Sequence, residues 1–133
     1  MRAVIEGRAS RRAAEFNAEK AARQGPALIE AGREAVATGQ LRKMIAADMR
    51  FRDFVPALSG NSLIAPALIP HLTYMQRVMG QVLMRDETPR DIWDEHEAIL
   101  GAVANGDGER AERLAREHIT HAVEFMVARL TES

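Results

Sequence analysis

Hydrophobic and polar residues are distributed along residues 88–130 with the spacing of amphipathic helices. Apolar positions recur in steps of three and four, in two successive patterns that meet at Gly106-Asp107. The apolar face of the first pattern comprises Ile92, His96, Ile99, Leu100 and Val103. The apolar face of the second comprises Ala111, Leu114, Ala115, His118, Ile119, Ala122, Phe125 and Met126. Each face includes one histidine, so we expect two inward imidazoles on adjacent antiparallel helices, a place where something could be bound.

Residues typical of helix ends flank both patterns. Thr88 is suited to cap the first helix, with Pro89 at the first helical position. Gly106 can end this helix in a left-handed conformation, and Asp107 can cap the next one. The pattern therefore predicts a helix–turn–helix unit over residues 88–130.

The rest of the chain also has helical periodicity, and no run of alternating β-branched residues predicts a strand. The apolar spacing predicts four further helices, over residues 2–23, 26–36, 40–58 and about 61–84. We place the breaks between them at Gln24-Gly25-Pro26, Thr38-Gly39 and Ser59-Gly60-Asn61. Pro56 is expected to bend or fray the third helix. The predicted fold class is therefore all-α, with about six helices.

Length, charge and composition indicate one soluble domain over residues 1–133. The formal net charge is −1, so nothing global attracts nucleic acid or an anionic membrane. The chain has no cysteine, which excludes disulfides and thiolate metal sites and fits a cytoplasmic protein. Residues 54–76 carry no formal charge, but three prolines argue against a membrane span there.

Asp48 and Arg52 are four residues apart on the third predicted helix and share its apolar face. Taken alone, this spacing indicates a partly buried ion pair within the helix. A single histidine on an apolar face is likewise most often an ordinary core residue. The two histidines and Asp48 together make a binding site a competing interpretation.

An ordered set of residues resembles the ligand-binding domain of FadR-type regulators within the GntR superfamily of bacterial transcription factors. The matching residues are Asp48, Phe51, Ser59-Gly60-Asn61, Glu95-His96, Gly106-Asp107, Ala111 and His118. The resemblance implies an antiparallel helical bundle with an internal pocket for a small organic acid, and a homodimer. Family members carry a winged helix-turn-helix before this domain. This chain begins at the effector domain, so we expect DNA binding only through a missing N-terminal domain.

In many members of that family, an Asp and three His hold a divalent metal, and the resemblance implies a similar site here. The carried-over ligands are Asp48, His96 and His118, whereas the fourth position is Arg52, which cannot lose its proton or bind a cation. One interpretation is a weakened Zn or Ni site in which Arg52 also clamps the effector carboxylate. In the other, no metal binds and Arg52 neutralises Asp48. The three surviving ligands slightly favour the metal.

Four other residues are weaker candidates for contact with the effector. Tyr74, Arg77 and Gln81 follow helical spacing on the fourth predicted helix, and Arg2 could reach the pocket from the first. Glu6, four residues after Arg2, offers it a simpler partner.

These observations predict a regulatory domain and not an enzyme. A rival interpretation is a metal-dependent hydrolytic centre at Asp48, His96 and His118, but no second inward carboxylate and no nucleophile motif support it. No residue is therefore assigned a catalytic role. A helical scaffold without a pocket is the third interpretation.

Overall fold

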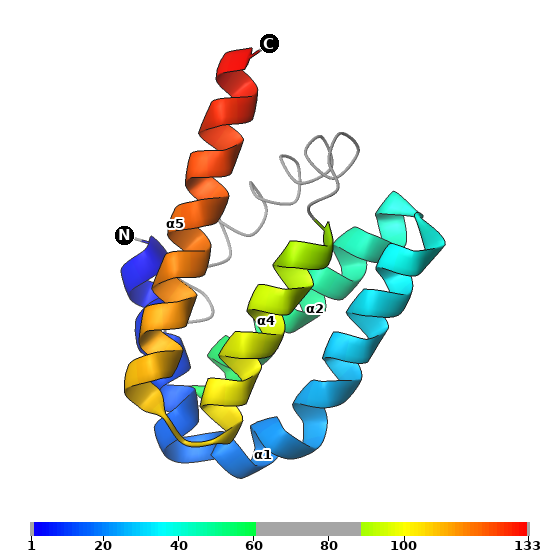
Figure 1. Cartoon of the computed structure of the whole chain (residues 1–133). Helices are drawn as coiled ribbons and strands as arrows, with labels where there is room; N and C mark the ends of the chain where they lie inside the picture. Colours follow the sequence, from blue (N-terminus) through cyan, green and yellow to red (C-terminus); the bar gives the residue numbers. More distant parts are fainter. Residues whose placement is uncertain (1, 61–88, 133) are drawn as a thin grey trace.

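The computed structural model describes residues 2–60 and 89–132 and, within them, the side chains of residues 3–60 and 92–121. These residues form four α-helices: α1 (Arg2–Thr38), α2 (Leu41–Leu58), α4 (Pro89–Ala104) and α5 (Gly108–Glu132) (Figure 1). The described part of the chain contains no strand, which confirms the all-α class. The helix predicted over residues 61–84 lies outside the described residues, so a count of about six helices is not confirmed.

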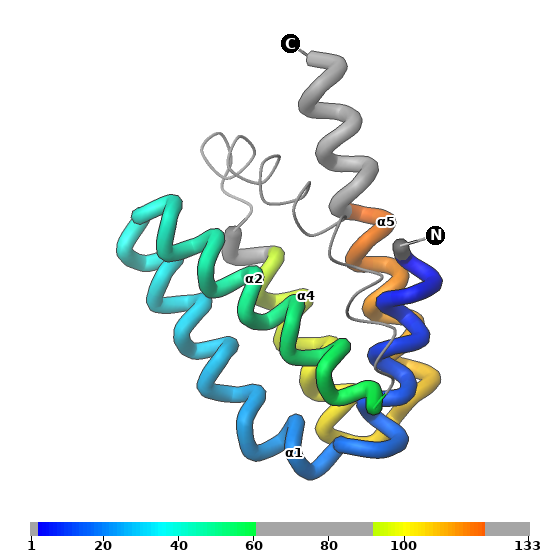
Figure 2. Tube along the Cα trace, turned by 180° about the vertical axis from the view of Figure 1, so that it is seen from behind, coloured from blue at the N-terminus to red at the C-terminus, as the bar shows by residue number. Residues whose placement is uncertain are grey.

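The long helix α1 organises the packing because it contacts each of the other three helices. It consists of two arms that meet at Asn17, whose backbone angles are non-helical (φ −139°, ψ 31°). The N-terminal arm lies beside α5, and the C-terminal arm runs along α2 and α4, as both views show (Figures 1 and 2). The core between these helices is built from small, aliphatic and aromatic side chains, including Ala13, Ala21, Phe51, Trp93, Leu100 and Val103.

The break that the sequence predicted at Gln24-Gly25-Pro26 is wrong, because α1 is helical there and its kink lies at Asn17. Gly25 does not end the helix but allows Leu100 to pack closely against it, because a Cβ at this position would lie 2.2 Å from Cδ1 of Leu100. Pro26 removes the hydrogen bond to the carbonyl of Ala22, a residue exposed to water that can replace the bond.

The kink in α1 provides groups that stabilise the end of α2. Asn17 Nδ2 donates a hydrogen bond to the carbonyl of Leu58 (2.7 Å), and Arg12 Nε donates to that of Ser59 (3.1 Å). Carbonyls at a helix C-terminus have no partner within the helix, so side chains of α1 satisfy them. Pro56 does not break α2, which stays helical up to Leu58.

The other predicted helix ends that fall within the described residues are confirmed. α4 begins at Pro89, although its predicted cap Thr88 lies outside the described residues. Gly106 has φ 73°, and Asp107 Oδ1 accepts a hydrogen bond from the amide of Arg110 (3.2 Å). At the end of α1, Gly39 has φ 68°, a left-handed conformation that glycine adopts without strain.

No helix within the described residues is long and apolar enough to cross a bilayer.

Candidate functional site

Four polar side chains from three helices meet in the interior of the bundle. Asp48 and Arg52 come from α2, His96 from α4 and His118 from α5, with exposed fractions of 2%, 7%, 1% and 5%. The prediction that both histidines face inward is confirmed, and their ring centroids are 4.8 Å apart. The i, i+4 spacing places Asp48 and Arg52 on the face of α2 that also buries Phe51 and Val55.

Asp48 is the centre of this group because both of its oxygens accept hydrogen bonds. Oδ2 accepts from Arg52 Nε (2.6 Å), and Oδ1 accepts from His96 Nε2 (2.8 Å). Burial by itself would raise the pKa of Asp48, but the charge of Arg52 and the hydrogen bond from His96 hold it well below the usual range. Burial would lower the pKa of Arg52, and Asp48 outweighs that effect and raises it. The two residues therefore form a buried ion pair.

His96 lies in an aromatic environment and is neutral at pH 7. Its ring stacks on Phe51 (centroids 4.4 Å apart) and meets Trp93 edge-on (4.9 Å). Burial lowers the pKa of His96 to about 4 in spite of the opposing hydrogen bond to Asp48. Because ionised Asp48 can only accept, Nε2 carries the single proton and Nδ1 is an acceptor. This Nδ1 is buried and has no hydrogen-bond partner among the described residues.

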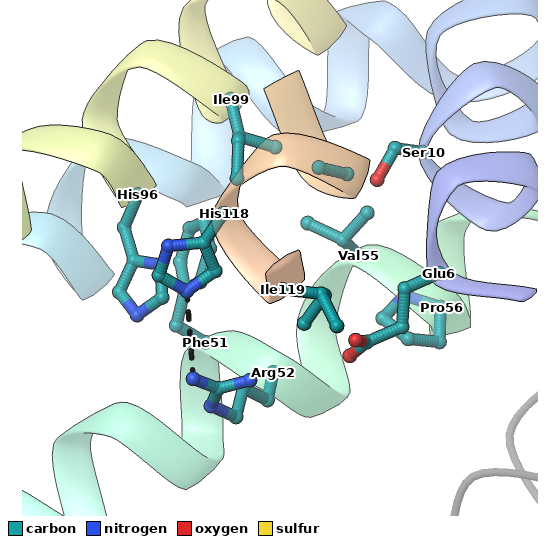
Figure 3. Close-up of a pocket in the computed structure, with 11 residues that line it drawn as sticks. Glu6, Ser10, Phe51, Arg52, Val55, Pro56, His96, Ile99, His118 and Ile119 are labelled. Atoms are coloured by element: carbon teal, nitrogen blue, oxygen red, sulfur yellow. Dashed lines mark hydrogen bonds between the residues drawn. The ribbon is translucent and has the colours of Figure 1, made fainter. Parts of the chain in front are cut away.

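His118 connects the buried ion pair to a more exposed carboxylate. Its Nδ1 makes a close hydrogen bond to Glu95 Oε2, and its Nε2 lies 3.5 Å from Arg52 Nη2, the contact drawn as a dashed line in Figure 3. A neutral ring that donates from Nδ1 and accepts at Nε2 satisfies both neighbours. Burial would raise the pKa of Glu95, but the hydrogen bond from His118 lowers it overall. The exposed Nδ1 of His121 lies 3.6 Å from the other Glu95 oxygen.

A small cavity adjoins this group, with room of ≈ 40 Å³ for the centre of a water-sized molecule. Helices α1, α2, α4 and α5 all contribute to its wall (Figure 3). Its described polar lining residues are Glu6, Ser10, Arg52, His96 and His118. Its described apolar lining residues are Phe51, Val55, Pro56, Ile99, Ala115 and Ile119.

Sequence reasoning assigned no cavity role to Glu6, Ser10 or Glu95. The spacing of Glu6 and Ser10 was the available signal, because they are four residues apart and Ser10 adjoins the buried Ala9. Glu95 was part of the family resemblance but received no role. Among the predicted effector contacts, Arg52 lines the cavity. Tyr74, Arg77 and Gln81 lie outside the described residues, and so does the side chain of Arg2.

The predicted metal ligands lie together but are engaged with other partners. Among the described side chains, those of residues 3–60 and 92–121, no three His, Asp or Glu residues are arranged to hold a metal ion. Asp48 Oδ2 is held by Arg52, and His118 Nδ1 by Glu95. The residues as arranged therefore do not fit a Zn or Ni centre, and a metal there stays a prediction that requires Arg52 to leave Asp48.

Fold and site together define an all-helical domain with a small cavity between its helices, lined by both polar and apolar side chains. The sequence matches the FCD domain over residues 1–121, which is most of the chain. The chain therefore belongs to the FCD family, the C-terminal domain of GntR-family regulators, as the ordered residues had indicated. A comparison with curated proteins finds no match.

Proposed function

We propose that this chain is the effector-sensing and dimerisation domain of a GntR-type transcriptional regulator, and that it binds a small carboxylate at Arg52. FCD domains belong to regulators that work with small-molecule effectors. DNA would be bound by a separate winged helix-turn-helix domain. The observation that carries the proposal is a buried guanidinium in the wall of a cavity.

Arg52 is suited to hold a carboxylate because its geometry is fixed and its donors are not exhausted. Asp48 orients the guanidinium through Nε, and the contact from Nη2 to His118 is long at 3.5 Å. A guanidinium has about five N–H donors in a planar fork that matches a carboxylate in a bidentate arrangement. We therefore expect the other N–H groups of the Arg52 guanidinium to bind the effector carboxylate.

A thermal-shift and calorimetric screen of small carboxylates tests this proposal. We expect at least one acid to stabilise the wild-type protein, and ligand at ~100 times its Kd would add about 2.7 kcal/mol to the free energy of unfolding. The double variant Asp48→Asn with Arg52→Gln removes both charges together, which avoids leaving one buried charge unpaired. This variant should lose acid binding, whereas Arg50→Gln, at an exposed position of the same helix, should retain it. Equal acid binding by all three proteins would contradict the proposal.

The alternative is a weakened Zn or Ni site formed by Asp48, His96 and His118. The unpartnered Nδ1 of His96 favours this alternative, because an imidazole nitrogen without a proton can bind a metal. Arg52→His would restore the fourth family ligand and remove a neighbouring positive charge. We therefore expect this variant to bind Zn or Ni at least tenfold tighter than the wild type, and to bind acids more weakly without metal. If calorimetry gives Arg52→His the same metal affinity as the wild type, the metal-site alternative is refuted and the metal-free carboxylate site remains.

The proposed role is regulatory, so no residue is expected to be catalytic. A hydrolytic centre would need a free carboxylate as general base, whereas both oxygens of Asp48 accept hydrogen bonds. Turnover of a bound acid by the purified protein would overturn this part of the proposal.

A further inference from the structure

An open groove of ≈ 700 Å³ lies between the C-terminal arm of α1 and helix α4, two segments that run side by side in Figures 1 and 2. None of its described lining residues belongs to the small cavity at Arg52. The floor of the groove includes the buried side chains of Ile29 and Leu100. Its other apolar lining residues are small: Ala21, Ala22, Pro26, Ala37, Gly101 and Ala104. The groove is therefore apolar and has room for a large side chain from another molecule.

Negative charge surrounds this apolar floor. Glu30 and Glu34 are exposed, lie four residues apart on α1, and have no ion-pair partner among the described residues. Arg33 is the only cation among the described lining residues, and Asp94 and Glu97 of α4 balance its charge. This acidic groove therefore fits a partner that presents both apolar and basic side chains.

The same chain presents such a surface on the other arm of α1. Val4, Arg8, Arg12 and Phe16 recur every four residues and therefore form one stripe along this arm. Val4 and Phe16 are 52% and 63% exposed, and Arg8 is exposed as well. The guanidinium carbon of Arg12 lies 5.1 Å from the centroid of the Phe16 ring, which holds a cation beside the exposed aromatic side chain. This basic stripe complements the acidic groove in both charge and apolar character.

We propose that the acidic groove binds the basic stripe of a second copy of this chain, with Phe16 of that copy on the apolar floor and its Arg8 beside Glu30 and Glu34. Burial of the aromatic side chain drives the association, and the opposite charges fix its register. Every copy carries both surfaces, so a two-fold arrangement makes the contact twice and closes the dimer. This inference rests on the dimerisation part of the proposed function and specifies its two surfaces.

Two charge-reversal variants test the two surfaces. Arg8→Glu with Phe16→Glu makes the stripe acidic, and Glu30→Arg with Glu34→Arg makes the groove basic; all four positions are exposed. Arg12 is left unchanged because it also donates a hydrogen bond to the carbonyl of Ser59. In analytical ultracentrifugation, each double variant alone should dimerise at least ~100-fold more weakly than the wild type, because like charges then meet in both contacts. An equimolar mixture of the two should form a heterodimer, since each stripe then meets a groove of opposite charge.

Matched controls and single variants keep this test decisive. Arg42→Glu and Glu117→Arg, at exposed positions outside both surfaces, should dimerise as the wild type does. If a double variant loses its helical circular dichroism, the single variants Arg8→Glu and Glu34→Arg replace it, and each should weaken the dimer at least tenfold.

The outcomes separate this inference from the proposed function. Dimerisation of both charge-reversal variants with wild-type affinity would overturn the inference and leave a dimer formed through another surface. Two folded variants that are monomeric both alone and in the mixture would overturn it as well, because opposite charges would then fail to restore the contact. A monomeric wild type would remove the dimer altogether, whereas the carboxylate site is decided independently by the screen of acids.

Discussion

At the scale of single residues, the site consists of polar groups that hold one another in fixed roles. Asp48 orients Arg52 and His96, and Glu95 orients His118. Interrupting such a network lowers the free energy of unfolding, because the loss of one partner leaves another group buried and without a hydrogen bond. Rigid orientation also favours binding, since the guanidinium need not be ordered when a ligand arrives.

The inward position of these residues and the ion pair within α2 could be predicted from the sequence, but the hydrogen bonds between different helices could not. Helical period alone places Asp48, His96 and His118 on apolar faces. The hydrogen bond between Asp48 and His96 joins positions 48 residues apart, so it depends on how α2 and α4 pack. The ion pair of Arg52 with Asp48 followed from their i, i+4 spacing, whereas the contact of Arg52 with His118 depends on how α2 and α5 pack.

His96 makes the stability of the protein depend on pH. Its pKa is about 4 in the folded state against 6.5 for an ordinary histidine, so the unfolded chain takes up its proton first as the pH falls. Folding free energy is therefore lost between pH 6.5 and about 4, and the gap corresponds to on the order of 3 kcal/mol. The pKa of Asp48 is lowered from 3.8, so its contribution is lost only below this window.

Urea unfolding between pH 7 and pH 4 measures this dependence. We expect the wild-type protein to lose stability steadily over this range, and His96→Gln, which retains an N–H donor for Asp48, to give a flatter profile. His121→Gln is the matched control, because His121 is exposed, and it should retain the wild-type slope. The assignment would be refuted by parallel profiles for wild type and His96→Gln.

At the scale of the helices, two glycines inside α1 provide space for contacts with α4, and one of them lies at a predicted break. Gly25 and Gly32 both lie inside α1, where Leu100 and Trp93 of α4 pack directly against them. Glycine is unfavourable inside a helix, so local propensity predicted a break that the contact between α1 and α4 overrides. The kink at Asn17 had no comparable signal, because it depends on a hydrogen bond to Leu58 of α2.

The same contacts predict opposite effects for two substitutions of glycine by alanine. A Cβ at Gly32 would lie 2.1 Å from Cζ2 of Trp93, and a buried indole cannot bend away. Such overpacking costs ~1–3 kcal/mol, which outweighs the ~0.5–1 kcal/mol that alanine gains in helix propensity. A Cβ at Gly101 would meet nothing within 4 Å, so alanine at that position should only gain helix propensity and stabilise the fold.

Chemical denaturation of both variants measures these effects. Gly32→Ala should unfold at lower denaturant than the wild type, and Gly101→Ala at higher. Because Trp93 contacts His96 edge-on, Gly32→Ala should also weaken the binding of a carboxylate effector. Equal stabilisation by both alanines would mean that α1 and α4 are not in close contact at Gly32.

At the scale of the whole molecule, all four described helices contribute to the wall of one cavity. Glu6 and Ser10 come from the first arm of α1, and the other lining residues come from α2, α4 and α5. A ligand that bridges these helices would stabilise their mutual arrangement, which is how binding could alter an attached domain. Helical periodicity predicted the all-α class, whereas an internal pocket was only implied by the family resemblance. The presence of Glu6 in the wall of the small cavity depends on the packing of α1.

The molecule is also expected to act as a homodimer. The domain exposes large apolar side chains that its own described residues do not cover, with Phe16 63% and Val4 52% exposed. A second copy could cover apolar surface of this kind, and the family resemblance implies such a dimer. Sedimentation velocity at micromolar concentration should therefore give about twice the 14.7 kDa of the chain. The Tm should rise with protein concentration, because association stabilises the folded state by mass action. A monomeric mass together with a Tm independent of concentration would refute a dimer made by this domain alone.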